Sequence, residues 1–129
     1  MTDVAQAFVP GHVTGFFTID EADEPTATGS RGAGVALSEG VTVTVRAADG
    51  REVVLNGDPV SMGAVDRVLG ALDATVQVRG VTDLPLGSGF GISGAMALGA
   101  AIGANDLLDR ALSENELVTV AHGAEVQAG

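Results

Sequence analysis

A glycine-rich segment between residues 83 and 95 constrains this chain more than any other part of the sequence. It alternates glycines with other residues from Gly87 to Gly91 and then opens at Ser93 into a long run of small apolar residues. Glycine allows dihedral angles that a Cβ atom would forbid, and it lets the backbone approach a ligand closely. The first amides of a following helix point toward any anion placed there. We therefore predict a phosphate cradle, in which Ser93, at the expected cap position, offers its hydroxyl to a phosphate oxygen or to Mg²⁺.

Two common phosphate-binding loops do not fit this segment. The Walker form places Lys and then Ser or Thr after its last glycine, and this chain contains no lysine. The dinucleotide-binding form needs an acidic residue about twenty positions further on, at the end of a second strand. Asp106 and Asp109 lie in range, but they follow a helical stretch without such a strand. A structural glycine turn capped by serine remains the alternative to a binding loop.

The composition indicates one domain with an acidic surface. The 129 residues carry a formal net charge of −11, and all six basic residues are arginines. A highly acidic chain without lysine resembles proteins of salt-loving archaea, and a merely acidic mesophilic protein is the alternative. Because the arginines are dispersed, we expect no nucleic-acid partner. The chain has no cysteine, no basic-then-apolar leader and no apolar run long enough to span a bilayer, so we expect a cytoplasmic protein without a membrane partner.

Apolar residues that alternate with polar ones predict strands. The clearest strand is 41–45, and we expect a turn at 48–50 that makes residues 52–55 its hairpin partner. Two short strands, 4–9 and 13–19, flank Pro10-Gly11, a pair that predicts a turn. A glycine-rich turn is expected at 29–34, and a further strand at 75–81.

Three helices are expected beside these strands. Residues 62–72 place apolar side chains on one face, with Ser61 as the cap. The small residues that begin at Ser93 extend to about residue 108, and such a helix can pack very close to a sheet. Ser113 and Glu116 form a capping box at the start of the last helix. The pattern predicts an α+β fold, with a mixed or antiparallel sheet and helices packed on one face.

Four segments resemble a known family of small-molecule kinases. Residues 85–95 resemble the phosphate loop of the GHMP kinases, P-x-G-x-G-L-G-S-S-x-A, with the second serine kept as Ser93 and the first replaced by Ile92. Residues 8–17, 29–34 and 121–126 resemble the archaeal branch of that family that phosphorylates pantoate. The resemblance covers essentially the whole chain. It implies that residues 1–129 are the N-terminal, ATP-binding domain of a longer enzyme, truncated here, without the C-terminal domain and inactive alone.

The resemblance also implies a function and a set of site residues. The enzyme would transfer a phosphoryl group from ATP to the 4-hydroxyl of pantoate, an early step in coenzyme A synthesis, with Mg²⁺ as the cation. Ser93 and Glu125 would bind Mg²⁺, His122 and Ser30 would be catalytic, and Arg31 and His12 would bind the acceptor. The positions expected to bind ATP are Pro85, Gly87, Ser88, Gly89, Gly91 and Ser93.

Other functions remain open from the sequence. The acceptor could be shikimate, homoserine or a mevalonate derivative, which would make the chain part of another GHMP kinase. A non-catalytic domain that binds nucleotide or only packs against a partner is the alternative from a different class. Each site residue also has a structural alternative, such as a solvated acid for Glu125 or a packing residue for His122. A homodimer is possible for kinases of this type.

Overall fold

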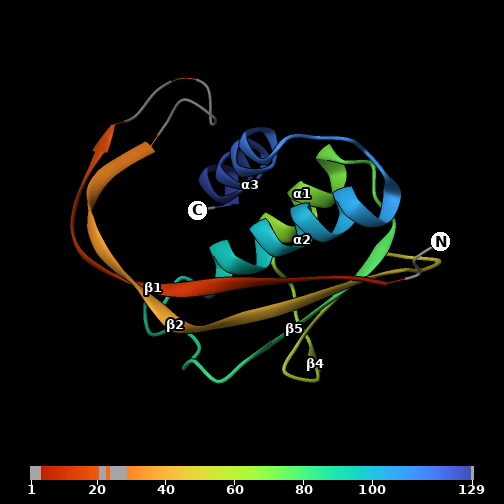
Figure 1. Cartoon of the computed structure of the whole chain (residues 1–129), viewed down its shortest axis with the longest axis horizontal. Coiled ribbons are helices and arrows are strands. Elements are labelled where there is room, and N and C mark those ends of the chain that lie inside the picture. Colours follow the sequence, from red (N-terminus) through yellow and green to blue (C-terminus); the bar gives the residue numbers. More distant parts are fainter. Residues whose placement is uncertain (1–3, 21–22, 24–28, 129) are drawn as a thin grey trace.

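The computed structural model describes residues 4–20, 23 and 29–128, which form one sheet with helices on one of its faces (Figure 1). The strands are β1 (Val4–Asp20), β2 (Gly29–Ala47), β3 (Glu52–Leu55), β4 (Asp58–Pro59) and β5 (Val76–Thr82). The helices are α1 (Gly63–Ala71), α2 (Ile92–Leu108) and α3 (Glu114–Ala128). Helix α2 lies directly against β1 and β2, and α3 packs across α1 and α2. The predicted α+β fold, with a mixed sheet covered on one face, is confirmed.

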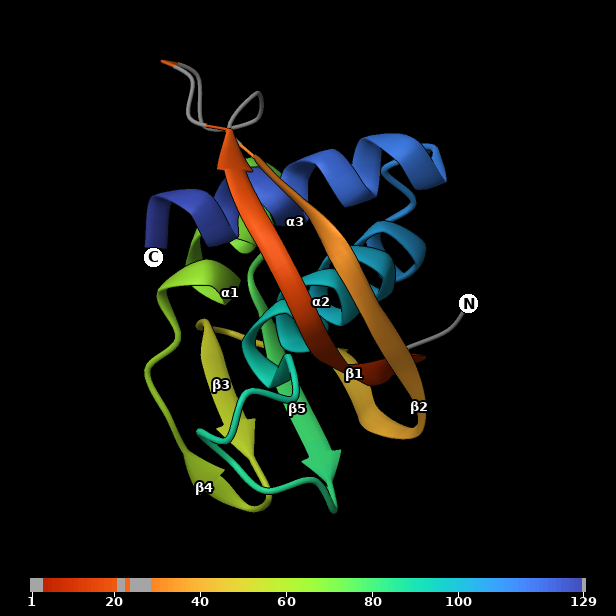
Figure 2. The same cartoon turned by 90° about the vertical axis from the view of Figure 1, so that its left-hand side faces the viewer.

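The order of the strands differs from the predicted hairpin. The sheet runs β1-β2-β5-β3-β4, so β5 lies between β2 and β3 (Figure 2). Strand β3 therefore pairs with β5, in parallel, and not with the strand that precedes it. The physical reason is the length of the ladder: β5 aligns seven residues with β2, from Val41 opposite Thr82 to Ala47 opposite Val76. The four residues of β3 could not pair with β2 over that length.

Strands β1 and β2 pair along most of their length, and two predicted turns are wrong. Pro10-Gly11 lies inside β1, where the register shifts between Pro10 and His12. A proline is tolerated at such a bulge because no ladder amide is required there. The glycine-rich segment 29–34 is also part of a paired strand, with Gly32 opposite Phe17. Glycine adopts extended dihedral angles as readily as turn angles, so its presence alone did not determine the conformation.

The core lies between the sheet and α2. Val41, Val43 and Val45 are fully buried on the helix-facing side of β2, as their alternation predicts. Gly99 and Gly103 of α2 face these valines: a Cβ atom at Gly99 would lie 2.4 Å from Val43 Cγ2, and one at Gly103 would lie 2.4 Å from Val45 Cγ2. The helix of small residues therefore packs directly onto the sheet, as expected.

The helix starts agree with the sequence in one case of three. Helix α3 begins with the predicted capping box, in which the Ser113 amide donates to Glu116 Oε1 at 3.0 Å and the Glu116 amide donates to Ser113 Oγ at 3.2 Å. The predicted cap Ser61 is wrong, because the N-cap of α1 is Met62, without a side-chain bond. The cap of α2 is Gly91, not Ser93, which lies within the helix.

Within the described part of the chain, no helix has the length and apolar character needed to cross a membrane.

Candidate functional site

The glycine-rich loop connects the end of β5 to the start of α2. Gly87, Gly89 and Gly91 all have left-handed backbone angles, with φ of +73°, +82° and +78°. A side chain at any of these positions would be strained, so the three glycines allow the loop to turn repeatedly within five residues. Of the other three positions predicted to bind ATP, Pro85 and Ser88 are exposed on the same loop, and Ser93 lies in the first turn of α2. The loop thus presents its backbone to solvent, as a phosphate cradle requires.

The N-terminus of α2 faces this loop. The first intrahelical bond runs from the Ala95 amide to Gly91 O at 3.0 Å, so the amides of residues 92–94 precede the helical ladder. The aligned peptide dipoles give this end a partial positive charge. Helices α1 and α3 each carry an acidic residue in their first turn, whereas α2 carries none. No acidic side chain in the first turn of α2 itself neutralises this charge.

Helix α3 brings a carboxylate to the same place. The Ser93 hydroxyl donates a hydrogen bond to Glu125 Oε1 at 2.7 Å, although the two residues are 32 positions apart in the sequence. Ser93 is exposed and Glu125 is half-buried, so both oxygens are at the surface beside the loop. His122 lies one turn earlier on α3 and is also half-buried. Two residues predicted as Mg²⁺ ligands are therefore adjacent.

This oxygen pair suits Mg²⁺ chemistry. Mg²⁺ forms bonds of about 2.1 Å in an octahedral shell, so neighbouring ligand oxygens lie about 3 Å apart, close to the separation found here. Among the described residues there is no group of three or more His, Asp or Glu side chains that could hold a metal by itself. One hydroxyl and one carboxylate fit a cation that takes its other ligands from water and phosphate oxygens.

The structure also places His12 at the loop. The His12 amide donates to Phe90 O at 3.0 Å, and its imidazole lies against Gly91. Ser30 and Arg31 are different, because the structure describes only their backbone, paired in β2 with Ile19 and Thr18. Their predicted side-chain contacts lie outside what the structure describes, so their roles stay predictions.

The residues that hold the start of the loop were not predicted from the sequence. Thr82 is buried at the end of β5, and its Oγ1 donates to Gly40 O at 2.8 Å and accepts from the Leu84 amide at 3.1 Å. The Thr82 amide donates to Asn56 Oδ1 at 2.9 Å. The one available signal was a threonine that follows the alternation of β5 on its buried side. These bonds fix the direction in which the chain leaves the sheet.

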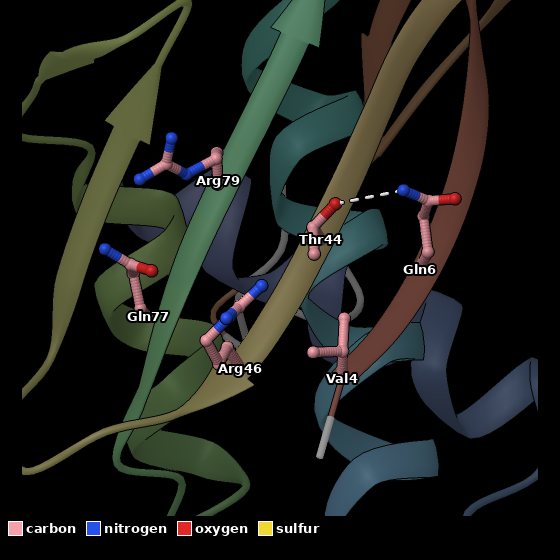
Figure 3. Close-up of a pocket in the computed structure, with 6 residues that line it drawn as sticks. All are labelled: Val4, Gln6, Thr44, Arg46, Gln77 and Arg79. Carbon is pink, nitrogen blue, oxygen red and sulfur yellow. Dashed lines mark hydrogen bonds between the residues drawn. The ribbon is translucent and has the colours of Figure 1, made fainter. Parts of the chain in front are cut away.

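A hollow on the opposite face of the sheet does not belong to this site. It encloses about 570 Å³ and contains none of the predicted site residues. Figure 3 shows side chains from β1, β2 and β5 around it, with Gln6 Nε2 donating to Thr44 Oγ1 at 3.2 Å. Its lining residues are Val4, Gln6, Thr44, Arg46, Gln77 and Arg79.

Comparison with known families identifies the class of protein to which this fold and glycine-rich loop belong. Residues 60–129, which include β5, the loop, α2 and α3, match the family described as GHMP kinases N terminal domain. The chain therefore belongs to the GHMP kinases.

Individual relatives indicate which members of this family the chain is similar to. The chain is 36% identical over 127 residues to a pantoate kinase of Methanocaldococcus jannaschii, covering 95% of this chain and 46% of that protein. It is 38% identical over 130 residues to a pantoate kinase of Methanospirillum hungatei, covering 94% and 45%. A solved structure of a phosphotransferase related to the CoA biosynthesis pathway matches with a TM-score of 0.85 and 34% identity, over 96% of this chain and 46% of that one. The chain thus spans less than half the length of these relatives.

Proposed function

We propose that residues 1–129 are the N-terminal, ATP-binding domain of a kinase that phosphorylates pantoate. The observation that carries the proposal is the glycine-rich loop with the Ser93–Glu125 pair at its helical end. The similarity to two pantoate kinases along nearly the whole chain supports pantoate as the acceptor. Because the chain spans less than half of those proteins, the remaining site residues would come from sequence beyond these residues.

Phosphoryl transfer depends mainly on positioning and on neutralising charge. In our proposal the loop amides and the amides that open α2 bind the α- and β-phosphates of ATP, helped by the helix dipole. The Ser93 hydroxyl and the Glu125 carboxylate hold Mg²⁺ beside them. When bound, the cation neutralises charge on the phosphate oxygens. The hydrogen bond between Ser93 and Glu125 keeps both oxygens in place before the nucleotide arrives.

The proposed acceptor contacts rest on the family resemblance. We keep Arg31 as a predicted contact of the pantoate carboxylate, and Ser30 and His122 as predicted catalytic residues; His12, also predicted to bind the acceptor, lies against the glycine-rich loop. A guanidinium suits a carboxylate because it donates two parallel hydrogen bonds. We further expect such an enzyme to act in the cytoplasm, and a homodimer remains a prediction.

The test is ADP release by the protein in its full length, in high KCl with Mg·ATP and a panel of acceptors. We expect turnover with pantoate and none with shikimate, homoserine or mevalonate. Ser93→Ala and Glu125→Ala should each lower kcat/KM by about a hundredfold, because each removes a group that would hold the cation, which in turn neutralises phosphate charge. Ser61→Ala and Asp106→Ala are matched controls at exposed positions away from the loop and should leave turnover unchanged.

Two other outcomes would change the proposal in different ways. Turnover with another acceptor would keep the kinase and overturn pantoate as its substrate. If none of the acceptors supports turnover, calorimetry with Mg·ATP separates a non-catalytic nucleotide-binding domain from a protein that does not bind nucleotide.

A further inference from the structure

We propose that His12 is a positioning residue, which braces the glycine-rich loop from β1 and fixes the direction of the amides that open α2. The inference rests on the proposed function, because those amides are taken to hold phosphate. It gives His12 a role that acts through the loop rather than through contact with the acceptor. Three contacts between β1 and the loop carry it.

The first contact is a backbone hydrogen bond. The register of β1 shifts between Pro10 and His12, and the His12 amide donates to Phe90 O in the loop at 3.0 Å. Strand β2 lies between β1 and β5 in the sheet, so this bond joins the loop to a strand two positions away from the one it leaves. Figure 2 shows the loop running from the end of β5 back toward β1 before α2 begins.

The second contact is a close approach at Gly11. A Cβ atom on Gly11 would lie 2.5 Å from Leu84 Cδ1 and 3.0 Å from Phe90 O. Both distances are shorter than normal packing allows, so the loop lies directly on the backbone of β1 at this point. Only glycine leaves room for the approach. The bulge in β1 is therefore shaped to receive both ends of the loop, Leu84 near its start and Phe90 near its end.

The third contact is made by the imidazole itself. A Cβ atom on Gly91 would lie 2.6 Å from His12 Nε2 and 2.8 Å from Cδ2, so the ring covers the side of Gly91 where a side chain would be. Gly91 is the N-cap of α2, and its left-handed conformation, φ +78° and ψ +28°, determines how the helix starts. Because glycine has many accessible dihedral angles, a neighbouring ring that limits its movement restricts the amides that follow. His12 is exposed to solvent, so the ring is not there to fill the core.

This geometry predicts a particular kinetic pattern. If His12 acts through the loop, His12→Ala raises the Kd and KM for Mg·ATP and leaves the KM for the acceptor unchanged. A direct contact with the acceptor would give the opposite pattern. A displacement of about 1 Å at a binding group can cost on the order of a hundredfold, so we expect the loss in nucleotide affinity to be about tenfold to a hundredfold.

The experiment compares three variants of the full-length protein with the wild type. His12→Ala removes the ring, His12→Phe keeps a planar ring over Gly91 without its nitrogens, and Val13→Ala truncates the next exposed residue of β1 as a control. Mg·ATP affinity is measured by calorimetry, and hydrogen exchange is followed at residues 84–94 without nucleotide. We expect weaker binding and faster loop exchange in His12→Ala only, with exchange in β5 unchanged.

Two results would overturn the inference. One is unchanged nucleotide affinity in His12→Ala together with a raised acceptor KM, which would make His12 an acceptor ligand. The other is a loss in His12→Phe equal to that in His12→Ala, because packing would then not be the cause. If the wild type binds no Mg·ATP, the proposed function fails, but the exchange measurement still tests the brace.

A double-mutant cycle tests the contact between the ring and Gly91 directly. Gly91→Ala introduces both a strained φ and a clash with the imidazole, whereas in the His12→Ala background only the strained φ remains. We expect the double variant to expose its loop amides no more than Gly91→Ala alone. Fully additive effects on loop exchange would show that the two residues act independently.

Discussion

The structure perturbs the titration of Glu116, a residue at the start of a helix. The bond from the Ser113 amide, followed by that from the Ser113 hydroxyl, lowers the pKa of the Glu116 carboxyl below its ordinary value of 4.5. Both bonds favour the ionised form because a carboxylate accepts hydrogen bonds more strongly than a carboxylic acid. The residue lies at the start of α3, the helix that also carries Glu125.

We predict that Glu116→Gln reduces the dependence of stability on acid pH. A carboxyl group whose pKa is lowered by folding contributes stability above its unfolded pKa, and that contribution is lost as the pH falls through the folded value. The wild type should therefore exceed the variant in unfolding free energy at pH 7, and the difference should shrink below pH 4.5. Urea unfolding at a series of pH values measures this, since urea adds no charge to screen the group.

Glu114→Gln is the matched control for this prediction. It removes a carboxylate from the same first turn but leaves the bonds between Ser113 and Glu116 intact. An equal change of pH dependence in both variants would assign the effect to the helix dipole in general and not to the capping box.

At the scale of elements, α2 packs closely against β2 because two glycines of the helix have no side chain at the contact. The approach of the helix depends on Gly99 and Gly103, neither of which has a left-handed φ. These glycines are therefore required by space, whereas Gly87 and Gly89 are required by their dihedral angles, and Gly91 by both. The distinction matters for substitution, because only the first kind is relieved by shrinking a neighbour.

We predict that Gly99→Ala lowers the unfolding free energy by about 1–3 kcal/mol, because the new methyl group would overlap Val43 in a fully packed core. Gly70→Ala is the matched control, since it places the same methyl group on α1 with nothing within 4 Å. That variant should gain about 0.5–1 kcal/mol from the higher helix propensity of alanine. Urea unfolding of both variants checks the pair, and a loss in Gly70→Ala equal to that in Gly99→Ala would contradict the packing argument.

The elements that the sequence predicted correctly depend on local patterns. The valines at 41, 43 and 45 alternate with polar residues and are buried as expected, and the capping box at Ser113 is a signal within four residues. The predicted pairing of β3 with β2 was wrong because β5, which begins 21 residues after β3 ends, lies between them in the sheet. No local signal distinguishes a hairpin partner from a strand that another strand will displace.

The candidate site was predictable to a similar extent. The left-handed glycines follow from their spacing, and the pairing of Ser93 with Glu125 was implied by family resemblance. The contact between His12 and Gly91 was not predicted, because it arises from a bulge in β1 that the sequence indicated as a turn. Thr82 and Asn56 were missed because the hydrogen bond between them joins segments far apart in the sequence.

For the whole molecule, we predict that the melting temperature rises between 0.1 M and 2 M KCl. The net charge of −11 destabilises the compact state through self-repulsion, and the screening length falls from about 10 Å at 0.1 M to about 3 Å at 1 M. A variant with Asp49→Asn, Asp58→Asn and Asp106→Asn, all at exposed positions, should melt higher at 0.1 M and gain less from salt. If KCl raises the melting temperature of the wild type and the variant equally, the salt acts by strengthening the burial of apolar surface and not by screening charge.

Because β5 lies at the centre of the sheet, the sheet is incomplete while the chain is being synthesised. Strands β2 and β3 are synthesised before β5, yet each pairs with it along an edge that no earlier strand covers. Unpaired edges of this kind are templates for association with other chains. A nascent chain therefore carries two open edges until residue 82 has emerged from the ribosome, and the sheet cannot close in the order in which its strands are translated.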